Sequence, residues 1–471
     1  VFSGQVEKKH TTNFLNIKGL RTYGTAEINI IDIVKPITKF SAIINNPNEV
    51  RYLLEKAYHY ATTGRPGPVW LDIPLDVQKA NINLSKLRKF KVFNNKNFIK
   101  KEKITNKVYK AIKLLKKSKT PLIVCGQGVR QANAIDEAKK IIRLVKAPVL
   151  FSRLGNDMIS HNTKYIFGLS GIKGSKFCKG ITKKADVILV LGSRLAIPFI
   201  GYKSEAFAKN AKIIMIDTDL SELKKPLKLE LKINSNVKDF LAQLKKNIKK
   251  TKLPNFSNWV NYCENLKKKN PMVMPSVKKN PIDLYYFMER LGKISHPKSI
   301  LITDAGSNYY IGGQVWHFEK GQREITSGSN AAMGLSIPLA IGASVAKPST
   351  NIYAVTGDGS LELNIQELKT ISHYNLNIKL FVINNGGYVS MLNWQDTIFK
   401  GRRLDTKDAT GAGSLNLKKI ANAFEMKWIK ISNTKNIDRN LMAINKIKGP
   451  VFVEVITTNK QKITDSFGYF T

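Results

Sequence analysis

Two short polar motifs contain the residues best suited to chemistry. Gly357-Asp358-Gly359-Ser360 follows the apolar, β-branched segment Asn351–Thr356, and Asn384-Asn385 ends a second apolar segment, Ile378–Ile383. A carboxylate and an amide oxygen, with a main-chain carbonyl nearby, are the hard oxygen ligands that suit Mg²⁺. The two glycines let the backbone approach a ligand closely, and the amides that start the next helix favour an anion. The motifs therefore predict a metal ion beside a diphosphate group.

A strand, a helix and a second strand must bring these motifs together. Leu361–Tyr374 has apolar residues at helical spacing, and Ser360 is the predicted N-cap of that helix. Parallel strands joined by one crossover helix usually lie side by side. We therefore expect Asp358 and Asn385 at the carboxyl ends of neighbouring strands, about 5 Å apart, where open α/β sheets bind ligands. The simpler interpretation of the same residues is a tight turn and a capping Asn pair.

Length and composition indicate a large globular protein. A chain of 471 residues with 43% hydrophobic residues can form two or three domains. No apolar run approaches the ~18 residues of a membrane span, and the first residues lack a signal-peptide pattern. The three cysteines, Cys125, Cys178 and Cys263, have no metal-binding spacing and fit a reducing cytosol with at least one free thiol. We expect a cytoplasmic protein without membrane contact.

The charge is strongly basic, with 77 Lys and Arg against 34 Asp and Glu, a net +43. Such a charge raises the alternative of a basic nucleic-acid binder. The cations are densest at Lys79–Lys119 and Lys245–Lys279, which we interpret as solvated linkers and helix faces. A helix-turn-helix, an aromatic RNA-binding motif and a zinc-finger spacing are all missing from the sequence. Nucleic acid is therefore disfavoured as the main partner.

Alternating strand and helix patterns predict α/β domains with parallel sheets. Pro121–Cys125, Ala185–Gly192 and Ala211–Asp217 have strand patterns, and Ile135–Val145 has a helical pattern. Two polar, basic stretches are interpreted as linkers by their composition. The predicted organisation is a partial domain at 1–80, a linker at 81–102, a central α/β domain at 103–250, a linker at 251–280 and a last domain at 281–471.

The stretch from Gly357 to Asn385 resembles the signature of thiamine diphosphate-dependent enzymes, and acetolactate synthase large subunits in particular. The resemblance extends over most of the chain and implies three-layer parallel-sheet domains of the thiamine diphosphate-enzyme type. It implies that Asp358, Asn385 and the carbonyl of Gly387 hold Mg²⁺, which anchors the cofactor diphosphate. It also implies a substrate channel flanked by Trp394 and Gln395, and a site shared between two subunits of a homodimer or homotetramer.

The same resemblance implies further cofactor contacts. Met333 matches the apolar residue that holds the cofactor in its bent form, although from the sequence alone it would be a core residue. Ser390 and Met391 match residues that face the thiazolium ring. The loop before Asn308 is either a diphosphate contact or a plain capping loop. The implied cofactor-binding residues are Gly306, Ser307, Asn308, Met333, Gly357, Gly359, Ser360, Ser390 and Met391.

The resemblance implies that the first domain is incomplete. IVKPITK and TGRPGPVWLDIPLDVQ resemble the last half of the pyrimidine-binding domain of acetolactate synthase-like enzymes. The first half, which contains the Glu that activates the cofactor in the family, has no counterpart here. No catalytic residue is therefore assignable in this chain.

The central domain resembles the one that binds FAD in acetolactate synthase. Gly168–Gly171, Gly192–Arg194 and Ile216–Asp219 fall where FAD contacts cluster in the family, whereas Leu195–Tyr202 departs from its pattern. The resemblance therefore leaves FAD open. Gly126-Gln127-Gly128 lacks a third glycine at Gln131, so we expect a plain turn there rather than a dinucleotide fingerprint.

The implied function is decarboxylation of pyruvate, or another 2-keto acid, and ligation of the two-carbon unit to a second carbonyl. The residues around Leu195–Tyr202 and Phe399–Arg402 are more similar to acetolactate synthase relatives of surface-sugar biosynthesis. Two alternatives follow, a carboligase that acts on a keto-sugar nucleotide and a non-catalytic protein that binds thiamine diphosphate.

Overall fold

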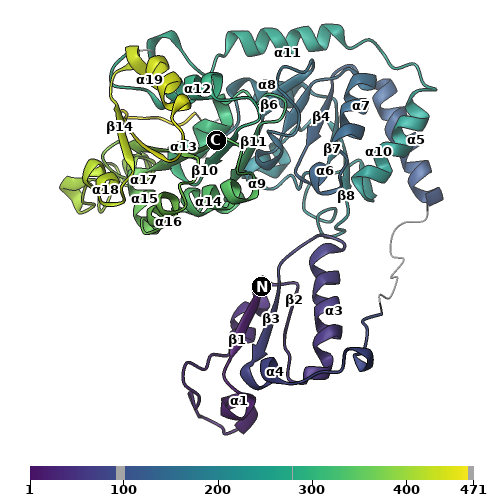
Figure 1. The fold of residues 1–471 in the computed structure, drawn as a ribbon. Coiled ribbons are helices and arrows are strands. Elements are labelled where there is room, and N and C mark those ends of the chain that lie inside the picture. The colour runs from purple at the N-terminus through teal and green to yellow at the C-terminus, as the bar shows by residue number, and fades with distance from the viewer. Residues whose placement is uncertain (92–100, 278, 465–471) are drawn as a thin grey trace. The chain divides into compact units, whose positions relative to one another are not determined.

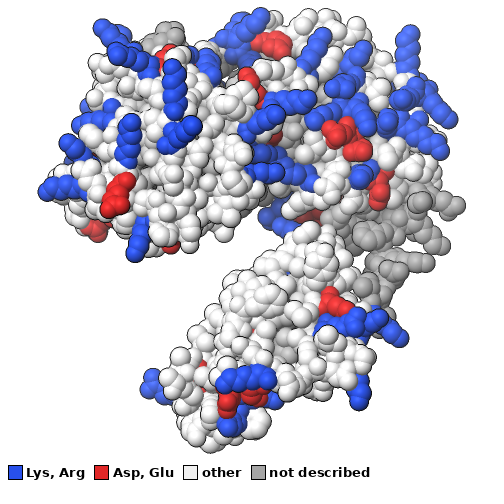
Figure 2. All heavy atoms as spheres, in the orientation of Figure 1, with Lys and Arg blue, Asp and Glu red and all other residues white. Residues whose placement is uncertain are grey.

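The computed structural model of the chain (Figure 1) describes residues 1–91, 101–277 and 279–464. The chain forms two compact units, Val1–Ile99 and Lys100–Thr471, and each is described here by itself. No helix among the described residues is long and apolar enough to cross a membrane. Lys and Arg side chains are spread over the face shown in Figure 2 rather than gathered in one patch.

The smaller unit is built on a three-stranded parallel sheet in the order β1-β3-β2. The strands are β1 (Phe2–Gln5), β2 (Phe40–Ile43) and β3 (Val69–Pro74). Helix α3 (Val50–Thr62) packs on the sheet and buries Ala57 against Leu71 and Ile44. Short helices complete the unit: α1 (Thr12–Leu15), α2 (Ile30–Val34) and α4 (Leu75–Lys79).

One carboxylate holds the long connection between β1 and α2. Glu27 accepts hydrogen bonds from the amides of Thr12 (2.5 Å), Tyr23 (2.9 Å) and Gly24 (3.3 Å), and from the Thr12 hydroxyl (2.6 Å). Burial opposes ionisation, but these hydrogen bonds outweigh it and lower the pKa of Glu27 to about 2. The ionised form of Glu27 therefore stabilises this connection.

The larger unit begins with a six-stranded parallel sheet in the order β6-β5-β4-β7-β8-β9. Helices α5 (Lys101–Lys117), α7 (Ile135–Val145) and α10 (Val237–Ile248) pack together on one face, and α8 (Lys176–Lys184) and α11 (Ser257–Lys269) cover the other. The strands are β4 (Pro121–Cys125), β5 (Val149–Phe151), β6 (Ile166–Leu169), β7 (Val187–Leu191), β8 (Lys212–Asp217) and β9 (Leu231–Asn234). All three cysteines are buried and free.

The prediction of a linker at 251–280 was wrong. Helix α11 takes up 13 residues of this stretch and buries Trp259, Val260 and Cys263 in the core of the central domain. The indole N–H of Trp259 donates to the carbonyl of Pro121 at 2.9 Å. The sequence pattern favoured a linker because many lysines lie on the exposed face of the helix and its apolar stripe is short. The other predicted linker, 81–102, falls largely outside the described residues.

The last domain is a second six-stranded parallel sheet, in the order β11-β10-β12-β13-β15-β14. Helices α12 (Leu284–Ile294), α13 (Gly306–Val315) and α19 (Ile437–Lys446) cover one face, and α14 (Ser336–Ala346), α16 (Glu367–His373) and α18 (Leu417–Ala423) cover the other. The predicted three-layer, parallel-sheet fold class is thus confirmed. The strands are β10 (Ile300–Thr303), β11 (Arg323–Thr326), β12 (Ile352–Gly357), β13 (Ile378–Asn384), β14 (Lys427–Ile431) and β15 (Val451–Ile456).

Buried ion pairs join the central and last domains within the larger unit. Arg153 forms an ion pair with Glu324 and donates to the carbonyl of Tyr309 at 2.9 Å. Burial raises the pKa of Glu324, and the charge of Arg153 opposes that rise. Beside this pair, Asp157 accepts from Arg130 (2.6 Å) and Arg323 (2.8 Å). Because the Glu324 and Asp157 carboxylates lie away from water, each depends on its arginine partners.

Replacing Glu27 by Gln should loosen the connection between β1 and α2. We expect roughly tenfold faster exchange of the amide hydrogens of Thr12, Tyr23 and Gly24 at pH 7, measured by hydrogen-exchange mass spectrometry, because a neutral acceptor binds them less well. The pKa is lowered in the folded chain, so this stabilisation is present above pH 4.5 and is lost as the pH falls toward 2. Glu7→Gln is the control, because the Glu7 carboxylate forms an ion pair with the exposed side chain of Lys9 at 3.2 Å. Equal exchange in the two variants would contradict this role.

Replacing Arg153 by Met should lower the free energy of unfolding by about 3–5 kcal/mol, because it leaves Glu324 buried without a counter-ion. Urea denaturation measures this loss. Arg323→Met is the matched control, since that side chain is 47% exposed and Asp157 keeps Arg130; its loss should not exceed about 1 kcal/mol. The double variant Arg153→Met/Glu324→Met should recover much of the loss. Equal losses in the two single variants would show that the pair is not the critical contact.

Candidate active site

The two polar motifs meet at one edge of the last sheet. Strands β12 and β13 are parallel neighbours, with Gly357 opposite Ile383. Asp358 opens the short helix α15 (Asp358–Leu361) directly after β12, and Asn385 follows the end of β13. The predicted strand pairing is therefore confirmed, and the two side chains come from adjacent strand ends.

The Asp358 carboxylate organises the turn after β13. Its Oδ2 accepts hydrogen bonds from the amides of Asn385 (3.2 Å), Gly386 (3.1 Å) and Gly387 (3.2 Å), and its Oδ1 accepts from the amide of Gly359 (2.9 Å). Burial raises the pKa of Asp358, and these four amides act in the opposite direction. The carboxylate thus fixes the backbone that carries the other predicted metal ligands.

The donor atoms at this point fit a Mg²⁺ ion. The Oδ1 atom of Asn385 is buried and has no hydrogen-bond partner among the described residues, which is costly unless another group binds it. Among the described residues, Oδ1 of Asp358 accepts a single hydrogen bond, from the Gly359 amide, and so retains a lone pair. Gly387 has φ +125°, and a Cβ there would lie 2.2 Å from the carbonyl oxygen of Thr406. Only glycine can therefore place a carbonyl at this position.

The described residues contain no group of three His, Cys, Asp or Glu side chains that could hold a metal. A site made of one carboxylate, one amide oxygen and one carbonyl suits a hard cation completed by water and phosphate oxygens. The chemistry of the donor set therefore favours Mg²⁺ over a transition metal.

A cavity of about 720 Å³ opens beside these ligands. Gly359 lies against the Tyr388 ring, and a Cβ at this glycine would be 2.2 Å from Cε1. The predicted N-cap at Ser360 was wrong, since Gly357 caps α15 and Ser360 lies inside it. The predicted helix 361–374 is also interrupted by a 3₁₀ turn, Glu362–Asn364. There Asn364 donates to the carbonyl of Gly334 at 3.1 Å, a tertiary contact that the sequence did not reveal.

The loop that starts α13 forms another wall of the cavity. Gly306 adopts φ +66°, and the hydroxyls of Ser307 and Ser390 lie 3.5 Å apart. The side-chain amide of Asn308 donates to Asp304 (3.3 Å) and to the carbonyl of Val355 (3.2 Å), whereas its buried Oδ1 has no partner among the described residues. The Asn308 amide nitrogen therefore fixes the loop, and both Ser307 and Asn308 line the cavity.

Apolar side chains form the rest of the wall. Met333, Met391 and Trp394 line the cavity and remain partly exposed, at 36%, 53% and 44%. Gln395 does not line it, because its side chain binds the backbone of Leu404 (3.0 Å) and the Thr406 hydroxyl (3.0 Å). The expectation that Gln395 flanks a channel is therefore not supported. The sequence analysis missed several lining residues, which had no local signal: Lys173, Tyr310, Asn330, Ala331, Asn393, Lys462 and Ile463.

Gly192 and Arg194, two of the residues expected near FAD, make contacts within the central domain. A Cβ on Gly126 would lie 2.4 Å from the carbonyl oxygen of Gly192, and the Gly126 and Gly128 amides donate to Leu191 and Gly192. The segment Gly126–Gly128 joins β4 to a short helix, α6 (Gly128–Gln131). Arg194 pairs with Glu222 at 2.8 Å, while Phe199, from the departing segment, packs in the core. No step of the function proposed below involves FAD.

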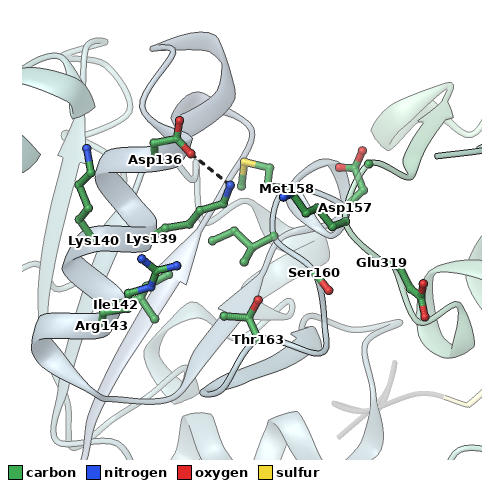
Figure 3. A pocket seen from close by; sticks show the side chains of 13 residues that line it. Asp136, Lys139, Lys140, Ile142, Arg143, Asp157, Met158, Ser160, Thr163 and Glu319 are labelled. Carbon is green, nitrogen blue, oxygen red and sulfur yellow. Dashed lines mark hydrogen bonds and ion pairs between the residues drawn. The ribbon is translucent and has the colours of Figure 1, made fainter. Parts of the chain in front are cut away.

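A second cavity, of about 480 Å³, lies beside α7 (Figure 3). Its lining charges are of both signs, and Lys139 turns to Asp136 at 3.2 Å. Asp157 is held by two arginines, as described above. This mixture gives the second cavity no clear preference for a charged ligand.

Comparison with known proteins identifies the family to which this fold and site belong. Residues 304–455 match the C-terminal TPP binding domain of thiamine pyrophosphate enzymes, and residues 108–244 match their central domain. The probable acetolactate synthase large subunit of Methanococcus aeolicus is 30% identical over 443 residues, which cover 89% of this chain and 72% of that protein. The chain belongs to the thiamine pyrophosphate enzyme family. The resemblance seen in the sequence is thus confirmed.

Other relatives of this thiamine pyrophosphate enzyme have similar names. The acetolactate synthase large subunit of Cyanidium caldarium is 28% identical, over 92% of this chain and 74% of its own. The acetolactate synthase isozyme 1 large subunit of Escherichia coli strain K12 is 28% identical over 437 residues, which cover 93% of this chain and 75% of that protein. The candidate metal ligands lie inside the matched C-terminal domain.

Replacing Asp358 by Ala should weaken Mg²⁺-dependent binding of thiamine diphosphate by at least about 100-fold, because it removes both a candidate metal ligand and the anchor of the 385–387 turn. Isothermal calorimetry with and without Mg²⁺ measures this. The control is Asp396→Ala on α17 (Val389–Ile398), an exposed carboxylate that pairs with Arg403 and does not line the cavity. Unchanged affinity of the Asp358 variant would reject the metal assignment.

Proposed function

We propose that this chain uses thiamine diphosphate and Mg²⁺ to decarboxylate pyruvate, or another 2-keto acid, and to join the two-carbon unit to a second carbonyl. The observation that supports this most directly is the buried, unpartnered Oδ1 of Asn385 beside Asp358, at the edge of a cavity. The acetolactate synthase names of the relatives support the choice of reaction.

In this proposal the polar wall binds and orients the cofactor. Asp358, Asn385 and the carbonyl of Gly387 hold Mg²⁺. Ser307 and the remaining polar or glycine positions hold the diphosphate: Gly306, Asn308, Gly357, Gly359 and Ser360. When bound, thiamine diphosphate supplies a nucleophilic carbon and accepts the electron pair that remains when CO₂ leaves.

The apolar wall has a different task. Met333 supports the bent cofactor, and Ser390 and Met391 face its reactive ring. Trp394 borders the path of the substrate. Together with Ile383 and Val389, these side chains keep water from the reacting atoms, which strengthens every charge interaction there. The partly exposed Met391 and Trp394 fit a site that a second copy of the chain completes, and we extend the proposal to a homodimer or homotetramer. No residue here is assigned the role of the activating acid.

The reaction is tested with pyruvate as the only substrate, together with thiamine diphosphate and Mg²⁺. We expect acetolactate, detected by chromatography and mass spectrometry, and loss of product when EDTA removes the metal. Asp358→Ala should reduce turnover to background, whereas Asp396→Ala should retain it.

Each other outcome points to a different function. Acceptance of pyruvate as donor without acetolactate formation, but with product when a keto-sugar nucleotide is added, would favour that acceptor instead. Cofactor binding without any turnover would replace the proposal with a non-catalytic binding role.

A further inference from the structure

The turn that carries the candidate metal ligands borders two cavities. Asp358, Gly387 and Tyr388 line both the cofactor cavity and a third, smaller cavity of about 290 Å³. Side chains therefore do not fill the space around residues 385–388, which we call the metal-binding turn. Its position depends on the hydrogen bonds that hold its backbone.

Two separate parts of the chain supply those hydrogen bonds. Asp358 accepts the amides of residues 385–387, as described above. The next amide, that of Tyr388, donates instead to the carbonyl of Thr406 at 2.9 Å. The same carbonyl oxygen lies against Gly387, where a Cβ would be 2.2 Å away from it. Thr406 is thus a second support of the metal-binding turn.

Thr406 is itself held in place by Gln395. The Thr406 side chain is buried, and its hydroxyl donates to Oε1 of Gln395 at 3.0 Å. Gln395 also accepts from the amide of Leu404 at 3.3 Å and donates to the carbonyl of Leu404 at 3.0 Å. One side chain therefore makes three hydrogen bonds with residues 404–406, and these fix the loop that supports the turn.

Gln395 belongs to the helix that begins at the metal-binding turn. Tyr388 is the N-cap residue of α17, and Gln395 lies about two helical turns further along. The contacts form a closed ring that runs from Tyr388 along α17 to Gln395, across to Thr406 and back to Tyr388. The first helical residue, Val389, also donates its amide to the carbonyl of Gly387 at 3.0 Å. The ring therefore orients this carbonyl, which keeps a second lone pair for a metal ion.

The geometry of a Mg²⁺ site makes such a support important. Mg²⁺ requires nearly ideal octahedral coordination, so a ligand that moves out of place lowers the affinity. Groups that orient metal ligands without touching the metal typically change the affinity by 10–100-fold. The carbonyl of Gly387 has no side chain to hold it, so its position is determined by the backbone contacts on either side.

We propose that Gln395 is a positioning residue for the metal site: through Thr406 and α17 it fixes the carbonyl of Gly387 and so sets the affinity for Mg²⁺. The inference rests on the function proposed above and deepens it by adding a support outside the cofactor cavity. It also replaces the channel role that the sequence resemblance implied for Gln395.

Hydrogen exchange in the metal-free protein measures this support directly. Gln395→Met removes all three hydrogen bonds, and Thr406→Val removes one while retaining the side-chain shape and the backbone carbonyl. By mass spectrometry we expect the amide of Tyr388 to exchange about tenfold faster in the first variant and about threefold faster in the second. Arg403→Met is the matched control, since its exposed ion pair with Asp396 joins the same helix to the same loop. Exchange at the wild-type rate in Gln395→Met would overturn the proposal.

Calorimetry then measures the consequence for the metal. Mg²⁺ is titrated into protein that contains saturating thiamine diphosphate. We expect Gln395→Met to weaken Mg²⁺ binding at least about tenfold, Thr406→Val at least about threefold and Arg403→Met less than about twofold.

A comparison of KM with kcat separates positioning from a channel role. At saturating Mg²⁺, Gln395→Met should recover the wild-type kcat and retain the wild-type KM for pyruvate, because excess metal compensates for a misplaced ligand. A residue that flanks the substrate path would behave in the opposite way. A raised KM for pyruvate at every Mg²⁺ concentration, with normal Mg²⁺ affinity, would reject the positioning role.

Failure of the two proposals can be told apart. Wild-type protein that does not bind thiamine diphosphate with Mg²⁺ would reject the proposed function and the metal role of Gln395 with it. Binding that Asp358→Ala abolishes and Gln395→Met leaves intact would reject the positioning role alone.

Discussion

The candidate site depends on one carboxylate that is bonded to the backbone of a neighbouring strand end. Asp358 accepts three amides of the 385–387 turn through one oxygen, so the turn cannot move independently of β12. That constraint aligns the Asn385 amide oxygen and the Gly387 carbonyl with the remaining lone pair of Asp358. In a buried setting, such a fixed arrangement of oxygens favours a cation without requiring reorganisation.

The central domain contributes to this site although its sheet lies elsewhere. Arg153 and Glu324 join the two sheets through a buried ion pair, and Gln314 binds the loop that carries Lys173. Helix α13 takes part in both contacts, since Arg153 also bonds the Tyr309 carbonyl. A change at this boundary would therefore reach the cavity wall through one rigid helix rather than through the metal ligands.

The chain carries a large net positive charge of +43. The Lys and Arg side chains on the face shown in Figure 2 are spread out, so the net charge by itself indicates no specific binding partner and does not determine the fold. Lys173 and Lys462 differ in position, since both line the cavity beside the candidate metal ligands.

The sequence by itself determined the strand-helix-strand unit, the parallel sheets and the meeting of Asp358 with Asn385. Apolar periodicity defines each element locally, and one crossover helix places the two strand ends side by side. Three features follow only from the three-dimensional structure: α11 packs as a helix, the segment after Ser360 breaks, and the Gln395 side chain bonds to Leu404 and Thr406 instead of lining the cavity. Each of these depends on contacts between residues far apart in the chain, such as Trp259 with Pro121 and Asn364 with Gly334, which no local pattern encodes.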